Sequence, residues 1–216
     1  MDKKVSVRSI VLLVGAYITC QLIADIGATR FVQIAGLSLS AGTFVFALTF
    51  TLRDMIHKRL GREWATAAIS AAALFNVFLA GYLWLISLFP APGWYQLSEG
   101  WNAIFSLVPA ITIGSILAEF ISEHVDTAIY HFWSTSNSFK RWPQWTRVLA
   151  SNVVSIPVDS AVFCSLAFSI VPWMLGSAGG MTLGNALLYA AGGQVIFKVL
   201  ITLVSLPMIY LTKERA

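Results

Sequence analysis

Three carboxylates lie close together in an apolar part of the sequence, and their spacing points to the binding of a cation, a proton or a polar ligand. Glu119, Glu123 and Asp126 follow the pattern i, i+4 and i+7, which aligns them along one side of a helix. Such a row repels itself, so it needs a bound cation, partial protonation, or a ligand that donates hydrogen bonds. The alternative interpretation places Glu123 and Asp126 near the inner membrane surface, paired with Arg53 or Lys140.

A second candidate site combines an acid with a base. Asp159 lies about 11 residues into one apolar segment and Lys198 about 15 into another, so at about 1.5 Å per residue both approach the middle of a membrane. A charged side chain at that depth costs roughly 2.5 to 3.5 kcal/mol on insertion scales, and is therefore paired or used. The two residues either neutralise each other or form part of a substrate site. Asn152 and Gln194 lie on the same segments and add hydrogen-bonding groups.

Further candidate binding residues lie in the first two apolar segments. Asp25 lies towards the outer end of the first segment, where it contacts either Arg30 or the entrance to a solute site. Asp54 lies in a basic stretch at the inner end of the second segment and is expected to pair with a specific partner. Phe44 and Phe46 are placed to stack on a flat heterocycle, and simple packing is the alternative.

The sequence offers little support for catalysis or for metal binding. His57, His124 and His131 do not form an HExxH motif, and no GxSxG motif or phosphate-binding P-loop is present. Cys20 and Cys164 lie inside apolar segments without metal-ligand spacing. We therefore predict no catalytic residue, no metal site and no cofactor. An intramembrane enzyme or haem protein that uses His124, His131 and the acidic row is the alternative.

The elements that position these residues are apolar helices. Of 216 residues, 57% are hydrophobic and 11% are charged, whereas a soluble domain is about half apolar and roughly a quarter charged. About 20 mostly apolar residues cross a bilayer as a helix. We predict an all-α membrane protein with a single domain over residues 1–216 and six transmembrane helices, near 9–28, 37–56, 64–89, 103–132, 148–172 and 183–211. Pro109, Gly192 and Gly193 are the expected break points in the long fourth and sixth helices.

The basic residues predict the orientation of these helices in the membrane. Arg30 is the only Lys or Arg in an outer loop, because the other loop bases fall on the opposite side of the predicted helices. Basic loops are retained in the cytoplasm, so both termini are expected there. The formal net charge of +4 arises from short clusters between apolar runs, which indicates a protein of the lipid bilayer and no nucleic-acid partner.

A short similarity recurs within the chain. Residues 125–130 resemble residues 158–163 at a spacing of 33, in the fourth and fifth predicted helices. These helices run in opposite directions, so a genuine repeat has inverted topology, as in many transporters. Chance is the alternative explanation for so short a match.

The sequence resembles the VUT family, also called queuosine-precursor transporters. The likeness is carried by residues 42–61, 123–130, 150–168 and 197–208, which together span most of the chain in order. The resemblance implies six helices in the cytoplasmic (inner) membrane and uptake of 7-deazaguanine precursors of queuosine, such as preQ0 and preQ1. The residues at matching polar positions of the family pattern are Asp54, Asp126, Asn152, Asp159 and Lys198.

The chain also departs from the family pattern. Glu123 stands where Gln is common, Asp25 stands about where Asn is expected, and Ala47 replaces a Pro. A related nucleobase or a vitamin therefore stays open as the ligand. A second hypothesis is a substrate-binding membrane subunit that needs an ATPase partner, and a homodimer or an energising subunit stays open as a partner.

Overall fold

The structure, a computed structural model, describes residues 6–136, 144–175 and 180–211. Within these ranges the side chains of residues 123, 127, 130, 131, 133–135, 144–148 and 206–211 lie outside the description. The expected partner Lys140, the side chain of Glu123 and the side chain of His131 therefore belong to the part of the chain that is not described.

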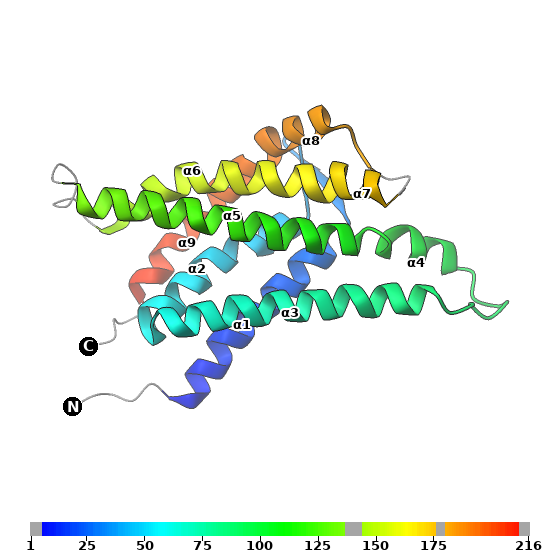
Figure 1. Cartoon of the computed structure of the whole chain (residues 1–216), viewed down its shortest axis with the longest axis horizontal. Helices are drawn as coiled ribbons and strands as arrows, with labels where there is room; N and C mark the ends of the chain where they lie inside the picture. Colours follow the sequence, from blue (N-terminus) through cyan, green and yellow to red (C-terminus); the bar gives the residue numbers. More distant parts are fainter. Residues whose placement is uncertain (1–5, 137–143, 176–179, 212–216) are drawn as a thin grey trace.

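The described residues form a bundle of long helices, as predicted (Figure 1). Its elements are α1 (Val7–Gly27), β1 (Phe31–Ile34), β2 (Leu37–Ser40), α2 (Gly42–Leu60), α3 (Arg62–Ser87), α4 (Ser98–Phe105), α5 (Val108–Thr135), α6 (Gln144–Ser165), η1 (Leu166–Ile170), α7 (Val171–Met174), α8 (Leu183–Tyr189), η2 (Ala190–Gln194) and α9 (Val195–Leu211).

Five described helical stretches are long and apolar enough to cross a membrane. They are α1, α3, the run from α4 into α5, the run from α6 to α7, and the run from α8 to α9. The remaining long helix, α2, is less apolar because its C-terminal half carries Arg53, Asp54, His57, Lys58 and Arg59. The predicted class, an all-α membrane protein built from six helical segments, is confirmed.

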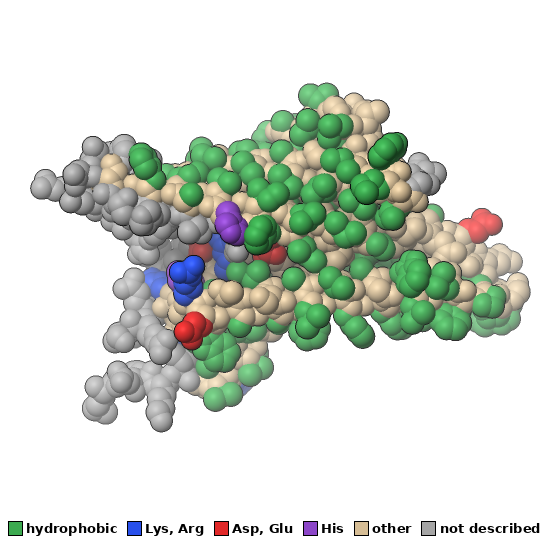
Figure 2. All heavy atoms as spheres, in the orientation of Figure 1, with side chains coloured by type: hydrophobic (Ala, Val, Ile, Leu, Met, Phe, Trp, Pro, Cys, Tyr) green, Lys and Arg blue, Asp and Glu red, His purple; other side chains and the backbone are tan. Residues whose placement is uncertain are grey.

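The exposed surface explains the composition. Figure 2 shows hydrophobic side chains over most of the drawn face, whereas the Lys and Arg side chains gather towards one end. On α3 alone, Leu74, Phe75, Phe78 and Trp84 are exposed. A soluble monomer rarely exposes a contiguous apolar patch larger than a few hundred Å². This surface is therefore suited to lipid, and the chain is a multi-pass membrane protein. Its orientation remains a prediction.

A β-hairpin stands where the start of the second helix was predicted. β1 and β2 pair antiparallel, with Phe31 opposite Ser40, so α2 begins at Gly42 and not near residue 37. The turn is made by Ala35 and Gly36 at φ 50° and 80°, and two positive φ values are typical of a tight two-residue hairpin. The alternation of Leu37–Ser40 covers only four residues, which is too short to stand out from the apolar run that follows.

The long predicted helices are interrupted near the expected positions. A break separates α4 from α5 directly before Pro109, which lies in the first turn of α5. Gly192 and Gly193 lie within η2, a π-helical segment of a kind that often marks functional sites. A second π-helical segment, η1, interrupts the run from α6 to α7 and was not predicted.

Two glycines allow the hairpin and α2 to pack tightly against their neighbours. A Cβ on Gly42 would collide with the backbone of Ala24 on α1, and a Cβ on Gly193 would collide with the backbone of Ser38 on β2. The hairpin is therefore seated directly on η2. This contact brings β2, η2 and the first turn of α2 together around the interior of the bundle.

Candidate functional site

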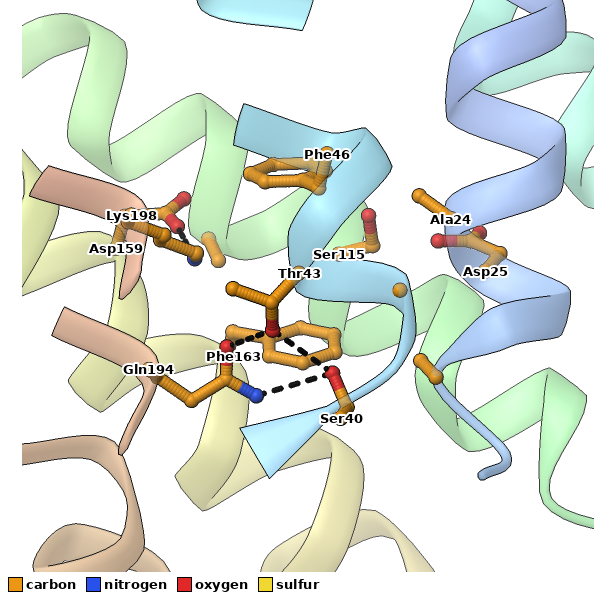
Figure 3. A pocket seen from close by; sticks show the side chains of 13 residues that line it. Ala24, Asp25, Ser40, Thr43, Phe46, Ser115, Asp159, Phe163, Gln194 and Lys198 are labelled. Carbon is orange, nitrogen blue, oxygen red and sulfur yellow. Dashed lines mark hydrogen bonds and ion pairs between the residues drawn. The ribbon is translucent and has the colours of Figure 1, made fainter. Parts of the chain in front are cut away.

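A pocket lies inside the bundle, where α1, β2, α2, α5, α6, η2 and α9 meet (Figure 3). About 330 Å³ in and around this pocket is free of protein atoms, and part of that volume is open solvent. Small residues on α1, directly after it, on α2 and on α5 leave this space free, namely Ala24, Ala28, Gly42 and Ala118. The remaining lining is polar or aromatic and consists of Asp25, Ser40, Thr43, Phe46, Ser115, Asp159, Phe163, Gln194 and Lys198.

A buried ion pair forms one wall of the pocket. The Nζ of Lys198 on α9 lies 2.5 Å from Oδ2 of Asp159 on α6, and the two side chains are 3% and 1% exposed. The other carboxylate oxygen, Oδ1, accepts a hydrogen bond of 3.3 Å from Ser122 on α5. The predicted meeting of Asp159 and Lys198 is therefore present in the structure, and the pair borders a cavity.

Two phenylalanine rings accompany the lysine. The Nζ of Lys198 lies 4.8 Å from the ring centre of Phe46 on α2 and 5.8 Å from that of Phe163 on α6. An ammonium group within about 6 Å of a ring centre is attracted to the ring face. The two rings thus hold the lysine head group at the cavity and offer flat apolar surfaces beside its charge.

A hydrogen-bond network around Gln194 forms another wall. Its Oε1 accepts a hydrogen bond from Thr43, and its Nε2 donates to Ser40 at 3.0 Å and to the Tyr189 hydroxyl at 3.4 Å. Ser40 also lies 3.1 Å from Thr43, hydroxyl to hydroxyl. The network joins the hairpin, α2 and η2, so it fixes the orientation of the amide that faces the pocket (Figure 3).

A second buried carboxylate lies across the pocket from the ion pair, as Figure 3 shows. Asp25 on α1 is 2% exposed, and its Oδ2 accepts a hydrogen bond of 3.3 Å from Thr112 on α5. Ser115, one turn further along α5, lines the pocket with it. Among the described residues, no cation forms an ion pair with Asp25, and this includes the exposed Arg30.

The acidic row on α5 is divided among different neighbours. Glu119 accepts hydrogen bonds from Tyr17 at 2.8 Å and from Gln21 at 3.1 Å, both on α1. Asp126 accepts a hydrogen bond of 3.2 Å from Ser155 on α6. The two described carboxylates of the row therefore connect α5 to neighbouring helices, and neither of them lines the pocket.

The two segments of the internal repeat face each other through reciprocal hydrogen bonds. Ser122 on α5 donates to Asp159 on α6, and Ser155 on α6 donates to Asp126 on α5. In each helix the serine precedes the aspartate by four residues. Such a two-fold exchange between neighbouring antiparallel helices is the arrangement that an inverted repeat produces, and it supports that interpretation of the similarity.

The remaining predicted residues lie away from the pocket. Phe44 packs against Phe197, with ring centres 5.9 Å apart. Asp54 lies 3.8 Å from Arg53, Oδ1 to Nε, at the basic end of α2. Asn152 lines a different hollow between α6 and α9.

Five predicted residues thus share the pocket, and five with described side chains do not. The first group is Asp25, Phe46, Asp159, Gln194 and Lys198, and the second is Phe44, Asp54, Glu119, Asp126 and Asn152. The pocket also contains polar and aromatic groups that were not predicted, namely Ser40, Thr43, Ser115 and Phe163.

Sequence signals for the missed residues were weak. Ser40 and Thr43 flank the unrecognised junction between the hairpin and α2. Hydroxyl residues are common in membrane helices, so Ser115 carried no signal by itself. Phe163 lies in the internal repeat, four residues after Asp159, which places it on the same helix face and is the one pattern that points to it.

Comparison with known proteins agrees with this architecture. The model of the family described as "Putative vitamin uptake transporter" matches residues 40–212. The chain is also similar to the "Probable queuosine precursor transporter" of Bacillus subtilis (strain 168), at 23% identity over 197 residues that cover 88% of this chain and 79% of the relative. No solved structure matches this chain. The family match includes the ion pair and the Gln194 network, but Asp25 lies before it.

Proposed function

This chain belongs to the "Putative vitamin uptake transporter" family, and we propose that it imports a 7-deazaguanine precursor of queuosine, such as preQ0 or preQ1, through the pocket described above. The name of the Bacillus subtilis relative supports this choice of substrate. The observation that carries the proposal is the Asp159–Lys198 ion pair in the wall of an interior cavity. Carriers commonly hold their ligand at such a depth between helices.

The polar groups of the pocket match the edge of a guanine-like ring. Adjacent N–H donors on that edge pair with both oxygens of a carboxylate, as Asp159 offers. The ammonium group of Lys198 donates to the neighbouring ring carbonyl. The amide of Gln194 provides a further donor and acceptor. Binding in this mode separates Lys198 from Asp159 and replaces their ion pair with contacts to the ligand.

The aromatic residues match the faces of the same ring. Phe46 and Phe163 come from different helices and both lie within about 6 Å of the lysine head group. A flat heterocycle between these rings gains offset or edge-to-face contacts worth about 0.5 to 1.5 kcal/mol per ring beyond burial. Binding and release without chemical change complete the proposed cycle, so the protein acts as a carrier and not as an enzyme.

Binding measurements on the purified full chain test the substrate. Titration calorimetry in lipid nanodiscs is expected to detect preQ0 or preQ1, and Asp159→Asn and Lys198→Met are expected to abolish the heat of binding. Glu99→Gln, on the exposed helix α4, is the matched control and is expected to bind as the wild type does. Binding of riboflavin, thiamin or biotin in place of the deazaguanines would reject the proposed substrate and favour a vitamin.

Transport measurements test whether the chain acts alone. Liposomes that contain only this chain are expected to take up labelled preQ0. Uptake that appears only after an ATPase complex is added would instead establish the substrate-binding subunit of the second hypothesis. Light scattering of the purified protein distinguishes a monomer from a homodimer in the same preparation.

A further inference from the structure

The pocket contains a buried carboxylate that forms no ion pair with any described residue. Asp25 is 2% exposed, yet its hydrogen bonds in the described structure come from neutral hydroxyls, those of Thr112, 3.3 Å away, and of Ser115. The other pocket carboxylate, Asp159, has both the Lys198 ammonium at 2.5 Å and the Ser122 hydroxyl. Two acids of the same pocket are therefore held in different electrostatic surroundings.

The described residues of the elements around Asp25 supply no compensating charge. On α5, Glu119 is the next ionisable group along the face towards α1, and it is itself acidic. On α6 and α9, Asp159 and Lys198 already neutralise each other across the pocket. The charged residues of α2 begin at Arg53, about 16 Å along the helix from its first turn at about 1.5 Å per residue.

The ionisable groups on the remaining neighbours do not alter this balance. The charged residues of α3, Arg62 and Glu63, lie at the start of that helix, at its junction with α2. Tyr17 lies two turns away on α1 itself, and its hydroxyl donates a hydrogen bond to Glu119. An ionised Asp25 would thus give the pocket a net negative charge in a low-dielectric interior.

Burial of an uncompensated charge costs several kcal/mol, and such a group binds a proton instead. An asparagine at this position would have the same shape and would always be neutral. Asp25 has the same size but can also ionise when water reaches the pocket. A neutral carboxylic acid that borders the substrate cavity can bind a proton on one side of the membrane and release it on the other.

We propose that Asp25 is the proton-binding site that couples this carrier to the proton gradient, with one proton moved in the same direction as each substrate molecule. The proposal rests on the proposed function for the identity of the substrate. The proton passes from outer water to a carboxylate oxygen of Asp25 and leaves to the cytoplasmic water once the pocket opens inwards. No bond to the substrate forms or breaks.

The thermodynamic consequence is a limit on accumulation. For an uncharged substrate, one co-transported proton permits a concentration ratio of about tenfold per unit of pH difference. A membrane potential of 100 mV adds a further factor of about 50. Without a titratable group at residue 25, the same carrier only equilibrates its substrate across the membrane.

Infrared spectroscopy tests the proton site without any substrate. The full chain in nanodiscs at neutral pH is expected to show the C=O stretch of a protonated carboxylic acid, shifted in deuterium oxide. Asp25→Asn should remove this band, while Glu99→Gln should leave it unchanged. Retention of the whole band in Asp25→Asn would overturn the proposal, whatever the substrate proves to be. The variant is expected to fold, because asparagine mimics the neutral acid.

Liposome transport tests the coupling. With wild type, an inward acid gradient of one pH unit is expected to concentrate labelled preQ0 about tenfold. Asp25→Asn should exchange labelled for unlabelled preQ0 across the membrane, yet give a final ratio near one. Accumulation by the variant equal to that of wild type, or accumulation driven only by a sodium gradient, would overturn the proposal. Absence of preQ0 exchange by wild type would instead reject the proposed function, and the infrared result would still decide the proton site.

Discussion

Removal of the Lys198 charge is the sharpest test of the pocket. Asp159 is 1% exposed in the wild type, and in Lys198→Met the hydroxyl of Ser122 is the one partner that the described residues leave to its carboxylate. Breaking a buried ion pair by the removal of one partner costs about 3 to 5 kcal/mol, because the other charge is left uncompensated. We therefore expect Lys198→Met, and equally Asp159→Asn, to be strongly destabilised.

The size of the effect follows from the length of the chain. For a protein of 150 to 250 residues, 1 kcal/mol corresponds to roughly 2 to 4 °C in Tm, so a loss of 3 to 5 kcal/mol predicts a decrease of about 6 to 20 °C. The double variant Lys198→Met with Asp159→Asn removes both charges. Its Tm is expected to recover most of this loss, because replacement of a whole buried pair by neutral groups is often close to neutral in stability.

Thermal unfolding of the purified variants in one detergent gives all four Tm values. Binding of preQ0 provides a second readout, because the double variant should be stable and still fail to bind. Two results would refute the reasoning. The first is a Tm for Lys198→Met within about 2 to 4 °C of wild type, which corresponds to 1 kcal/mol or less. The second is a double variant whose loss equals the sum of the two single losses, because that sum means that the residues do not interact.

Other expected outcomes concern the remaining walls of the pocket. Gly193→Ala is expected to lower the Tm, because its Cβ would collide with the backbone of the hairpin, whereas Gly192→Ala, with open space around its Cβ, should leave the Tm unchanged or raise it. Equal Tm values for the two variants would contradict the seating of the hairpin on η2. Gln194→Leu should weaken preQ0 binding by about five- to 150-fold, since it leaves polar groups of the bound ligand without their partner at about 1 to 3 kcal/mol, and calorimetry measures the change. Phe46→Leu should weaken binding by about two- to tenfold through the loss of ring contacts, and unchanged affinity would exclude stacking on this ring.

The sequence predicted how deep a charged side chain lies in the membrane, but not which neighbouring helix it contacts. The positions of Asp159 and Lys198 along their apolar segments were enough to predict that they meet, because the rise of a helix fixes depth. The spacing of Glu119, Glu123 and Asp126 predicts a single row of carboxylates, but in the structure Glu119 accepts hydrogen bonds from α1 and Asp126 accepts one from α6. Spacing along one helix says which residues share a stripe, and it does not say which neighbour covers each part of that stripe.

The hairpin shows a second limit. Its strands cover four residues each, and its turn uses Ala35 and Gly36 in place of a strong Asn-Gly signal. Adjoining apolar residues extended the predicted helix over the second strand. Ser40 and Thr43 consequently had no predicted role, although both bind Gln194 at the pocket.

The amino-acid sequence by itself determined that this chain crosses a membrane several times and that its few charges in the apolar segments must be paired or used. Both conclusions depend on the transfer of side chains between water and lipid, which is a property of each residue and adds up along the chain. The tertiary structure alone decided that Asp25, Phe46 and Gln194 surround one cavity with the Asp159–Lys198 pair. A cavity is set by the crossing of helices and by the small residues where they approach, and these are relations between segments distant in the chain.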